Sequence, residues 1–330
     1  MAKFNGLLLH FFIFFAVILT SLLFYVHFKY GHPNDYGVDR FFYRDNIVPS
    51  WAEYVKFLLF QFTVFIGLAY GKSRSLRYIV LLLLSLAAQY AVGEKFTGLF
   101  GSLLLFLIPF IILQKVELRL IIKNIKFLSV AGVVCLGLMF SVYLSYSAMS
   151  GEDAVNRFLD RLVLQSQLWW SLDAISFGDI KSFNEIWMHF FGFDNSDAHQ
   201  MGIFYIMYLV SPDYIYDWFV SRNINMTMGG PVNLIYFFGY ILAFPAVIIL
   251  GFLLGCIYVI FYKAIQHADV LLIFLSVKGL DKLQRAIGMG DFHYIFSIPM
   301  LLNFSLFFIY VLISYAVLPR NKSVENHYVC

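Results

Sequence analysis

Two arginines, and the polar and aromatic residues that follow them, form the stretch of this chain best suited to chemistry. Arg157 and Arg161 are spaced i, i+4, so a helix would place both guanidinium groups on one face. Guanidinium groups are the best bidentate ligands for phosphate oxygens. The next residues are amides and indoles, which can hydrogen-bond sugar hydroxyls and stack on pyranose rings: Gln165, Gln167, Trp169 and Trp170. The stretch predicts a site for a sugar joined to phosphate; pairing of the arginines with nearby surface carboxylates is the alternative.

Two histidines further along are the side chains best suited to accept a proton. An imidazole titrates near neutral pH, which suits a general base. His199 lies in a polar turn over residues 194–199, whereas His189 is flanked by Trp187, Phe190 and Phe191. We therefore predict His199 and His189 as catalytic candidates. A structural role in the core is the alternative, above all for His189.

Basic residues inside or beside apolar runs are a second source of positive charge. Lys278, Lys282 and Arg285 would fall within roughly 60° of one another on a helix that turns about 100° per residue. Lys95 follows Glu94 in a tight connection between two apolar runs. Charges at this depth are costly and usually face a cavity or each other. We expect these four cations to help bind an anionic ligand; snorkelling to lipid headgroups, or pairing of Glu94 with Lys95, is the alternative.

Sequence signals for metals, cofactors and nucleic acid are absent. Cys135, Cys256 and Cys330 have no metal-ligand spacing. The sequence contains no Gly-rich phosphate loop and no nucleophile elbow. Net charge is only +3 and the basic residues are scattered, which argues against a nucleic-acid-binding surface. We predict a protein that uses no metal and no cofactor.

The composition is that of an integral membrane protein. Hydrophobic residues make up 61% of the chain and charged residues only 13%, far from the usage of soluble domains. A bilayer core of about 30 Å needs roughly 20 apolar residues per helix. Eight runs meet this need, near residues 5–27, 54–71, 77–93, 97–114, 126–147, 232–262, 268–289 and 293–317. The sequence therefore predicts an all-α, polytopic membrane protein with about eight transmembrane helices.

The distribution of basic residues predicts the orientation and three parts of the chain. Short basic connections at residues 72–77 and 115–126 fall on one side, which the positive-inside rule makes cytoplasmic. Residues 1–147 would form a membrane region of five helices, and residues 232–330 one of three helices. Residues 148–231 would form one large periplasmic loop with amphipathic helices. Membrane lipid is then an obligatory neighbour.

Three local features carry narrower predictions. The run over residues 232–262 is too long for one upright span, so we expect a kink at Pro245. Gly251 and Gly255 form a Gly-x-x-x-Gly pair that predicts helix packing. The aromatic stretch from Met201 to Val220 is expected to lie at the membrane interface.

The whole chain resembles the bacterial Wzy-type polymerases, which join O-antigen oligosaccharide repeat units. The resemblance rests on the large central loop and on three motifs: Gly93-Glu94-Lys95-Phe96, the stretch from Arg161 to Trp170, and Met228-Gly229-Gly230-Pro231 before a span with Gly239 and Gly251. It implies a multi-pass protein of the bacterial inner membrane with its active site facing the periplasm. It also implies an inverting, metal-independent glycosyltransferase.

The resemblance implies a substrate and a separate role for each group of candidate residues. The growing glycan would move from undecaprenyl diphosphate to a new lipid-linked repeat unit, with a chain-length regulator as a further partner. Arg157 and Arg161, with the cations on residues 278–285 and at Lys95, would stabilise the leaving diphosphate. His199 or His189 would take the proton of the acceptor hydroxyl.

Three other functions fit parts of the same pattern. An O-antigen ligase uses the same donor but transfers the glycan to lipid A core. A flippase or transporter of lipid-linked oligosaccharides is the non-enzyme alternative, although the chain shows no internal repeat of the kind common in transporters. A structural membrane scaffold would leave the cationic face of residues 278–285 unexplained.

Overall fold

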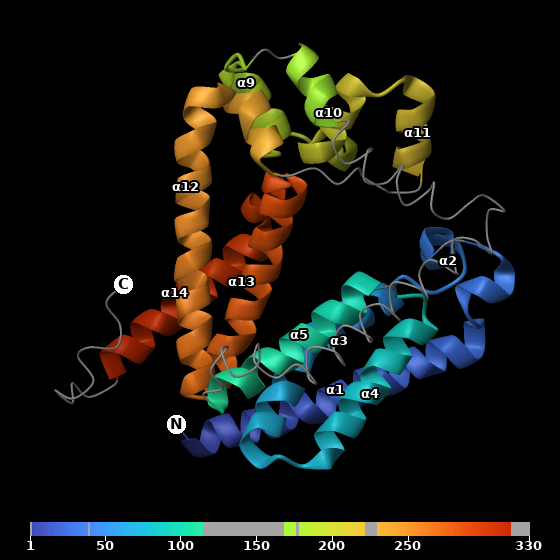
Figure 1. The fold of residues 1–330 in the computed structure, drawn as a ribbon, viewed down its shortest axis with the longest axis vertical. Coiled ribbons are helices and arrows are strands. Elements are labelled where there is room, and N and C mark those ends of the chain that lie inside the picture. Colours follow the sequence, from blue (N-terminus) through green and yellow to red (C-terminus); the bar gives the residue numbers. More distant parts are fainter. Residues whose placement is uncertain are drawn as a thin grey trace, which may run out of the picture. The chain divides into compact units, whose positions relative to one another are not determined.

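The structure is a computed structural model that describes residues 2–38, 40–94, 96–114, 168–175, 178–221 and 230–317. Within these ranges the regular elements are all helices, as predicted (Figure 1). Three helical stretches there are long and apolar enough to cross a bilayer: Asn5–Tyr36, Trp51–Ser73 and Gly230–Gln266. Three shorter apolar helices cover Leu76–Ala91, Gly98–Leu113 and Ile298–Ile313. The predicted run at 126–147 lies outside the described residues.

The chain divides into two compact units. The first comprises Met1–Phe158 and Ala264–Leu271, and the second comprises Leu159–Lys263 and Leu272–Cys330. The boundaries of these units differ from those of the three parts predicted from hydropathy. The three parts describe membrane topology rather than packing, and they remain a prediction.

Helix α3 is the centre of the first unit. The elements of this unit are α1 (Ala2–Tyr30), η1 (Pro33–Tyr36), α2 (Arg40–Asn46), α3 (Trp51–Ser73), α4 (Leu76–Ala91) and α5 (Phe96–Leu113). The side chains of α3 are mostly buried, and the helix contacts α1, α4 and α5. Gly67 of α3 lies so close to Phe106 of α5 that a Cβ there would overlap the Phe106 carbonyl. Small residues of this kind allow membrane helices to approach at backbone distance.

A short polar seam joins three helices of the first unit. Thr20 of α1 lies 3.0 Å, oxygen to oxygen, from Ser85 of α4. On the next turn of α4, Gln89 accepts a hydrogen bond from Ser102 of α5. All four side chains are buried, and hydrogen bonds between buried polar groups stabilise helix contacts in an apolar surrounding.

The second unit is built around α10 and the first part of α12. Its elements are a helical stretch over residues 168–175, α9 (Phe183–Glu185), η2 (Ile186–Phe190), η3 (Ala198–Gln200), α10 (Gly202–Val210), α11 (Asp213–Ser221), α12 (Gly230–Gln266), α13 (Val270–Met289), η4 (Phe292–Phe296) and α14 (Ile298–Val317). Ile203, Ile206 and Met207 of α10 are fully buried together with Phe237 of α12. The core therefore includes α10.

The structure differs in two ways from what the sequence predicts for this region. The sequence predicts the stretch from Met201 to Val220 as one amphipathic segment at the membrane interface. In the structure α10 is a core helix, whereas α11 has no buried residue, and the position of either helix at the interface remains a prediction. Apolar periodicity does not distinguish a helix that packs on protein from one that packs on lipid. The last predicted run also begins later than expected, because residues 292–296 form a 3₁₀ turn and α14 starts at Ile298.

The break in α12 lies at Gly239 rather than at the expected Pro245. Gly239 has φ 66° and ψ 172°, which are not helical values, and Figure 1 shows a sharp turn near the top of α12. Glycine tolerates this conformation because it has no Cβ. A Cβ on Gly239 would also overlap the carbonyl oxygen of Gly178. By contrast, Gly251 and Gly255 have no atom within packing distance in the described part of the chain.

Candidate functional site

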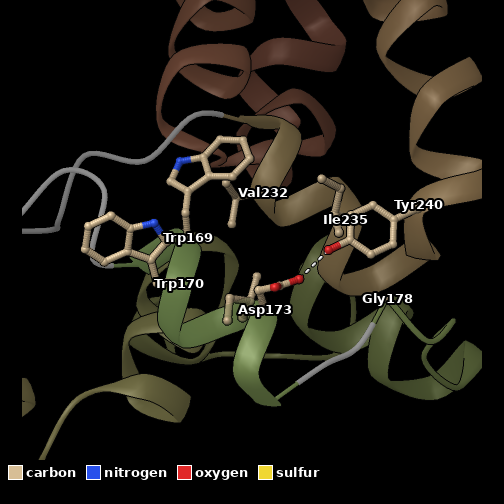
Figure 2. Close-up of a pocket in the computed structure, with 8 residues that line it drawn as sticks. Trp169, Trp170, Asp173, Gly178, Val232, Ile235 and Tyr240 are labelled. Atoms are coloured by element: carbon tan, nitrogen blue, oxygen red, sulfur yellow. Dashed lines mark hydrogen bonds between the residues drawn. The ribbon is translucent and has the colours of Figure 1, made fainter.

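A pocket of about 410 Å³ in the second unit is the main candidate site (Figure 2). Its wall combines the helical stretch after residue 167, a loop glycine and the two sides of the break in α12. The lining residues are Trp169, Trp170, Leu172, Asp173, Gly178, Val232, Ile235 and Tyr240. Asp173 is the only charged residue among these described lining residues.

Helical spacing explains why the two tryptophans face the pocket. Leu168 and Leu172 are one turn apart and are both buried in the core of the unit. This anchoring turns the opposite face outward, and Trp169 and Trp170 are 40% and 66% exposed. Figure 2 shows the two indole rings side by side at one end of the pocket. Exposed indoles of this kind offer a flat apolar surface with one hydrogen-bond donor each.

The polar end of the pocket is a hydrogen bond between Tyr240 and Asp173. The Tyr240 hydroxyl donates to Oδ1 of the Asp173 carboxylate, across 67 residues of sequence (Figure 2). An ionised carboxylate has several acceptor sites. Within the described chain, only this one bond to Asp173 is present. Asp173 can therefore accept a further hydrogen bond from a ligand hydroxyl.

Two glycines bring the walls of the pocket together. Gly178 has φ 73°, and a Cβ there would overlap the ring of Tyr240. The carbonyl of Gly178 in turn lies against Gly239. The loop is fixed at this point because the Lys181 amide donates to the Phe237 carbonyl at 3.0 Å. The break in α12 therefore creates the space in which Tyr240 reaches Asp173.

A second polar cluster joins α9, α10 and the first part of α12, which also carries the pocket residues Val232 and Ile235. The hydroxyls of Tyr205 and Tyr236 donate to Oε1 of Glu185, at 3.1 Å and 2.8 Å. Burial raises the pKa of Tyr205 to about 12, so this phenol stays protonated and remains a donor. The cluster holds residues 178–190 against α10 and α12.

Neither predicted histidine is among the described residues that line the pocket, and His189 contacts this cluster. His189 stacks on Tyr205 with ring centroids 3.8 Å apart. Its Nδ1 lies 2.6 Å from the Gln200 carbonyl, and since a carbonyl only accepts, Nδ1 must donate and Nε2 is left as the basic atom. His199 lies one residue before Gln200, with Nδ1 3.3 Å from Asp197 Oδ1. The structure thus joins both histidines to one turn.

The predicted basic residues on residues 278–285 share one helix, as the spacing required. Lys278 and Lys282 are one turn apart on α13, and the ammonium of Lys282 lies 5.3 Å from the centre of the Tyr294 ring. Arg285 belongs to the same helix. Neither Lys278 nor Lys282 is among the described residues that line the pocket. Their proposed role near an anionic ligand remains a prediction.

Several predicted site residues lie outside the described part of the chain. These residues are Lys95, Arg157, Arg161, Gln165 and Gln167.

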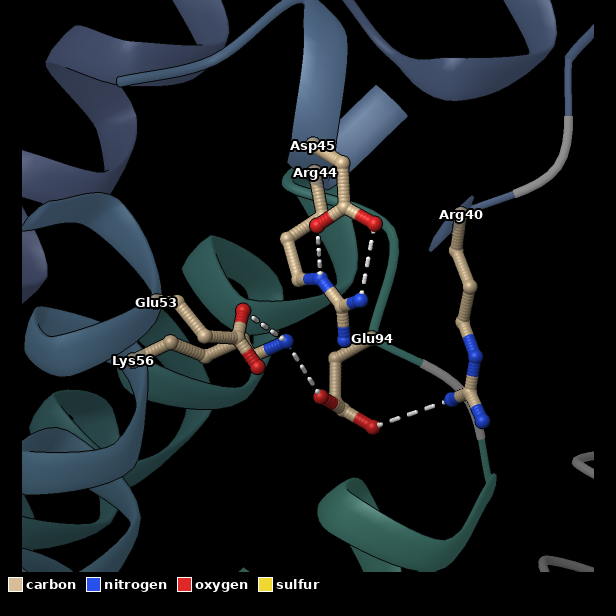
Figure 3. Close-up of polar contacts among 6 residues, drawn as sticks. All are labelled: Arg40, Arg44, Asp45, Glu53, Lys56 and Glu94. Carbon is tan, nitrogen blue, oxygen red and sulfur yellow. Dashed lines mark hydrogen bonds and ion pairs between the residues drawn. The ribbon is translucent and has the colours of Figure 1, made fainter. Parts of the chain in front are cut away.

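Glu94, the neighbour of Lys95, belongs to an ion-pair network in the first unit (Figure 3). Its carboxylate lies 3.5 Å from Arg40 and 3.0 Å from Lys56. Lys56 also pairs with Glu53, and Arg44 makes two hydrogen bonds to Asp45. The six charges drawn in Figure 3 balance, which indicates a structural network rather than an anion site.

Sequence reasoning found the two tryptophans of the pocket but missed Asp173, Gly178 and Tyr240. Asp173 is one of 20 acidic residues, and Tyr240 one of 22 tyrosines. The signal in the sequence that could have indicated Asp173 as a pocket residue is its position one helical turn after Trp169. No group of three or more His, Cys, Asp or Glu suited to a metal occurs in the described ranges.

Comparison with known proteins gives one partial match. Residues 196–304 match the model of a family of unknown function, DUF6418. The match spans about a third of the chain and includes α10 to α13 and Tyr240, but neither tryptophan of the pocket nor Asp173. No curated protein and no solved structure matches the chain. The function must therefore be argued from the site.

Proposed function

We propose that this protein is a membrane-embedded glycosyltransferase that polymerises oligosaccharide repeat units, an O-antigen polymerase. It would transfer the growing glycan from undecaprenyl diphosphate to a new lipid-linked repeat unit on the periplasmic face of the inner membrane. The observation that carries the proposal is the pocket formed by Trp169, Trp170, Asp173 and Tyr240 at the break of a membrane-length helix.

The chemistry of the pocket supports a sugar as its ligand. Two exposed indoles supply surfaces for ring stacking, and the Asp173 carboxylate supplies an acceptor for hydroxyl groups. The volume of about 410 Å³ lies within the usual range of ligand pockets, about 300–1,000 Å³. A site built from α12 would keep a polar sugar close to the bilayer that anchors its lipid carrier.

The proposal includes a topology in which the chain crosses the membrane about eight times. Residues 148–231 form the large periplasmic loop of this arrangement, so that Trp169, Trp170 and Asp173 lie on the periplasmic side. The long helix α12 then enters the membrane after its break at Gly239. This places the pocket at the interface, where the diphosphate of a lipid carrier is found.

The reaction would proceed by inverting displacement. An acceptor hydroxyl oxygen attacks the anomeric carbon of the donor glycan, the bond from this carbon to the diphosphate oxygen breaks, and undecaprenyl diphosphate leaves. Arg157 and Arg161, aided by Lys95, Lys278, Lys282 and Arg285, would stabilise the leaving charge.

The hydroxyl proton would pass to a nearby base. His189 and His199 remain candidates for this base, and the pocket adds Asp173, which already holds one hydrogen bond from Tyr240.

The lipopolysaccharide banding pattern of a deletion strain tests this proposal. We expect core carrying a single repeat unit in the deletion, a restored ladder with wild type, and no ladder with Arg161→Ala at normal protein level. Loss of all glycan from the core would indicate a ligase or a transporter instead. A ladder unchanged by the deletion would contradict the proposal.

A further inference from the structure

We infer that the pocket between Trp170 and Tyr240 takes an uncharged sugar and excludes an acidic one. The inference rests on the proposed function, because it takes the ligand to be a sugar, and it adds the chemical class of that sugar. Neutral hexoses, N-acetylated amino sugars and deoxy sugars belong to the accepted class. Uronic acids and other sugars with a carboxylate belong to the rejected class.

The charge of the described lining is the first argument. Among the described lining residues, Asp173 alone is charged, and its charge is negative. A carboxylate on the ligand would face this like charge without a neighbouring cation in the described wall to offset it. The donor that lies closest to Asp173, the Tyr240 hydroxyl, already gives its hydrogen to Asp173. It is therefore committed and cannot also neutralise an acidic sugar.

The acceptor capacity of Asp173 is the second argument. Tyr240 occupies Oδ1, and Oδ2 has no protein partner in the described chain. A carboxylate oxygen accepts but does not donate, so it suits a sugar hydroxyl or amide N–H. Hydrogen bonds to a charged acceptor are stronger than those between neutral groups. The pocket is therefore suited to ligands with hydroxyl or amide hydrogen-bond donors.

The apolar wall is the third argument. Val232 and Ile235 of α12 line the pocket together with the two indoles. Such a wall favours the apolar face of a pyranose ring, an acetamido methyl or a deoxy methyl. The side chains of Val232 and Ile235 have no hydrogen-bond donor that could replace the water lost by a carboxylate on entry.

A matched pair of small sugars tests the inference on purified full-length protein in detergent. Methyl glucoside and methyl glucuronide differ in the oxidation of C6, so their main difference is one negative charge. We expect methyl glucoside to bind about tenfold more tightly, measured by tryptophan fluorescence or calorimetry. The preference should shrink at high salt, because screening weakens repulsion between partly exposed charges.

Three variants assign the preference to Asp173. Asp173→Asn should bring the two affinities within about twofold, by weakening methyl glucoside and strengthening methyl glucuronide. Tyr240→Phe removes the hydrogen bond to Asp173 and should change the affinity for both sugars, but it keeps the charge of Asp173 and should therefore keep the order of the two affinities. Asp217→Asn, an exposed position on α11, is the matched control and should behave as wild type.

The outcomes separate this inference from the proposed function. Equal or tighter binding of methyl glucuronide to wild type, no binding of either sugar, or an unchanged preference in Asp173→Asn would overturn the inference. None of these results depends on polymer formation. A normal lipopolysaccharide ladder in the deletion strain would overturn the proposed function, even if the purified protein still prefers the neutral sugar.

Discussion

At the scale of single residues, Trp170 is the most direct probe of the pocket. It is 66% exposed and lines the pocket without belonging to the buried core. Trp170→Ala should leave the fold intact and lower the rate of polymer formation about tenfold, since an exposed aromatic surface for stacking is lost. The measurement is ladder intensity at matched protein level.

Trp218→Ala is the control for this prediction. Trp218 lies on α11, is 47% exposed and does not line the pocket. The control should polymerise normally. Equal activity of Trp170→Ala and wild type would remove this tryptophan from the site.

His293 gives the second unit a dependence on pH. It lies in the turn before α14, and burial lowers its pKa from 6.5 to about 4. The unfolded chain therefore binds a proton between these values that the folded chain does not. The free energy of unfolding should have its full value above pH 6.5. It should fall by roughly 3 kcal/mol as the pH drops towards 4, because each pKa unit corresponds to about 1.4 kcal/mol.

Thermal unfolding at several pH values, followed by circular dichroism, measures this effect. His293→Gln keeps a polar side chain of similar length without the titration. Its melting temperature should change less than that of wild type between pH 7 and pH 4.5. Parallel curves for the two proteins would show that another group is responsible.

Residue types in the sequence indicated the indoles of the pocket but not its carboxylate. Trp169 and Trp170 are two of five tryptophans, so their position next to polar residues was informative. Asp173 gains its role from Tyr240, 67 residues further along the chain. A contact of this kind depends on tertiary structure, which residue spacing along one helix cannot supply.

At the scale of elements, the break at Gly239 is the feature on which the pocket depends. Gly239→Ala would require a positive φ at alanine and would push its Cβ into the Gly178 carbonyl. We expect loss of polymer and a melting temperature lower by several degrees, since a combined clash and strain costs about 1–3 kcal/mol.

Gly251→Ala is the matched control in the same helix. Gly251 has helical geometry, and a Cβ there would meet no atom within 4 Å in the described chain. The control should be as stable and as active as wild type. Similar losses in both variants would mean that α12 is sensitive to any added Cβ rather than to the break.

Hydropathy predicted the helices well and their breaks poorly. Seven of the eight predicted apolar runs fall on α1, α3, α4, α5, α12, α13 and α14, and the run at 126–147 lies outside the described residues. The break in α12, however, falls at Gly239 rather than at Pro245. A proline at the outer surface of a helix can be accommodated when a neighbouring turn adjusts, whereas the close approach of Gly178 requires a residue without a Cβ. Helix formation is thus a local property, whereas the position of a break depends on the segment that packs against it.

At the scale of the whole molecule, the sequence predicted a helical membrane protein but not its division into units. An apolar fraction of 61% is typical of a membrane protein, and three described helical stretches are long and apolar enough to span a bilayer. The two compact units instead combine segments far apart in the chain, such as residues 168–175 with α12. The segments that belong to each unit are determined by contacts between buried side chains, and hydropathy does not predict these contacts.

Reconstitution tests the central claim most directly. Purified protein would be placed in liposomes containing undecaprenyl-diphosphate-linked single repeat units, and the products analysed by mass spectrometry. We predict lipid-linked glycans of two and more repeats, with one undecaprenyl diphosphate released per bond formed and no loss of activity when a chelator is added. Single repeat units that persist unchanged beside correctly folded wild-type protein would contradict the account.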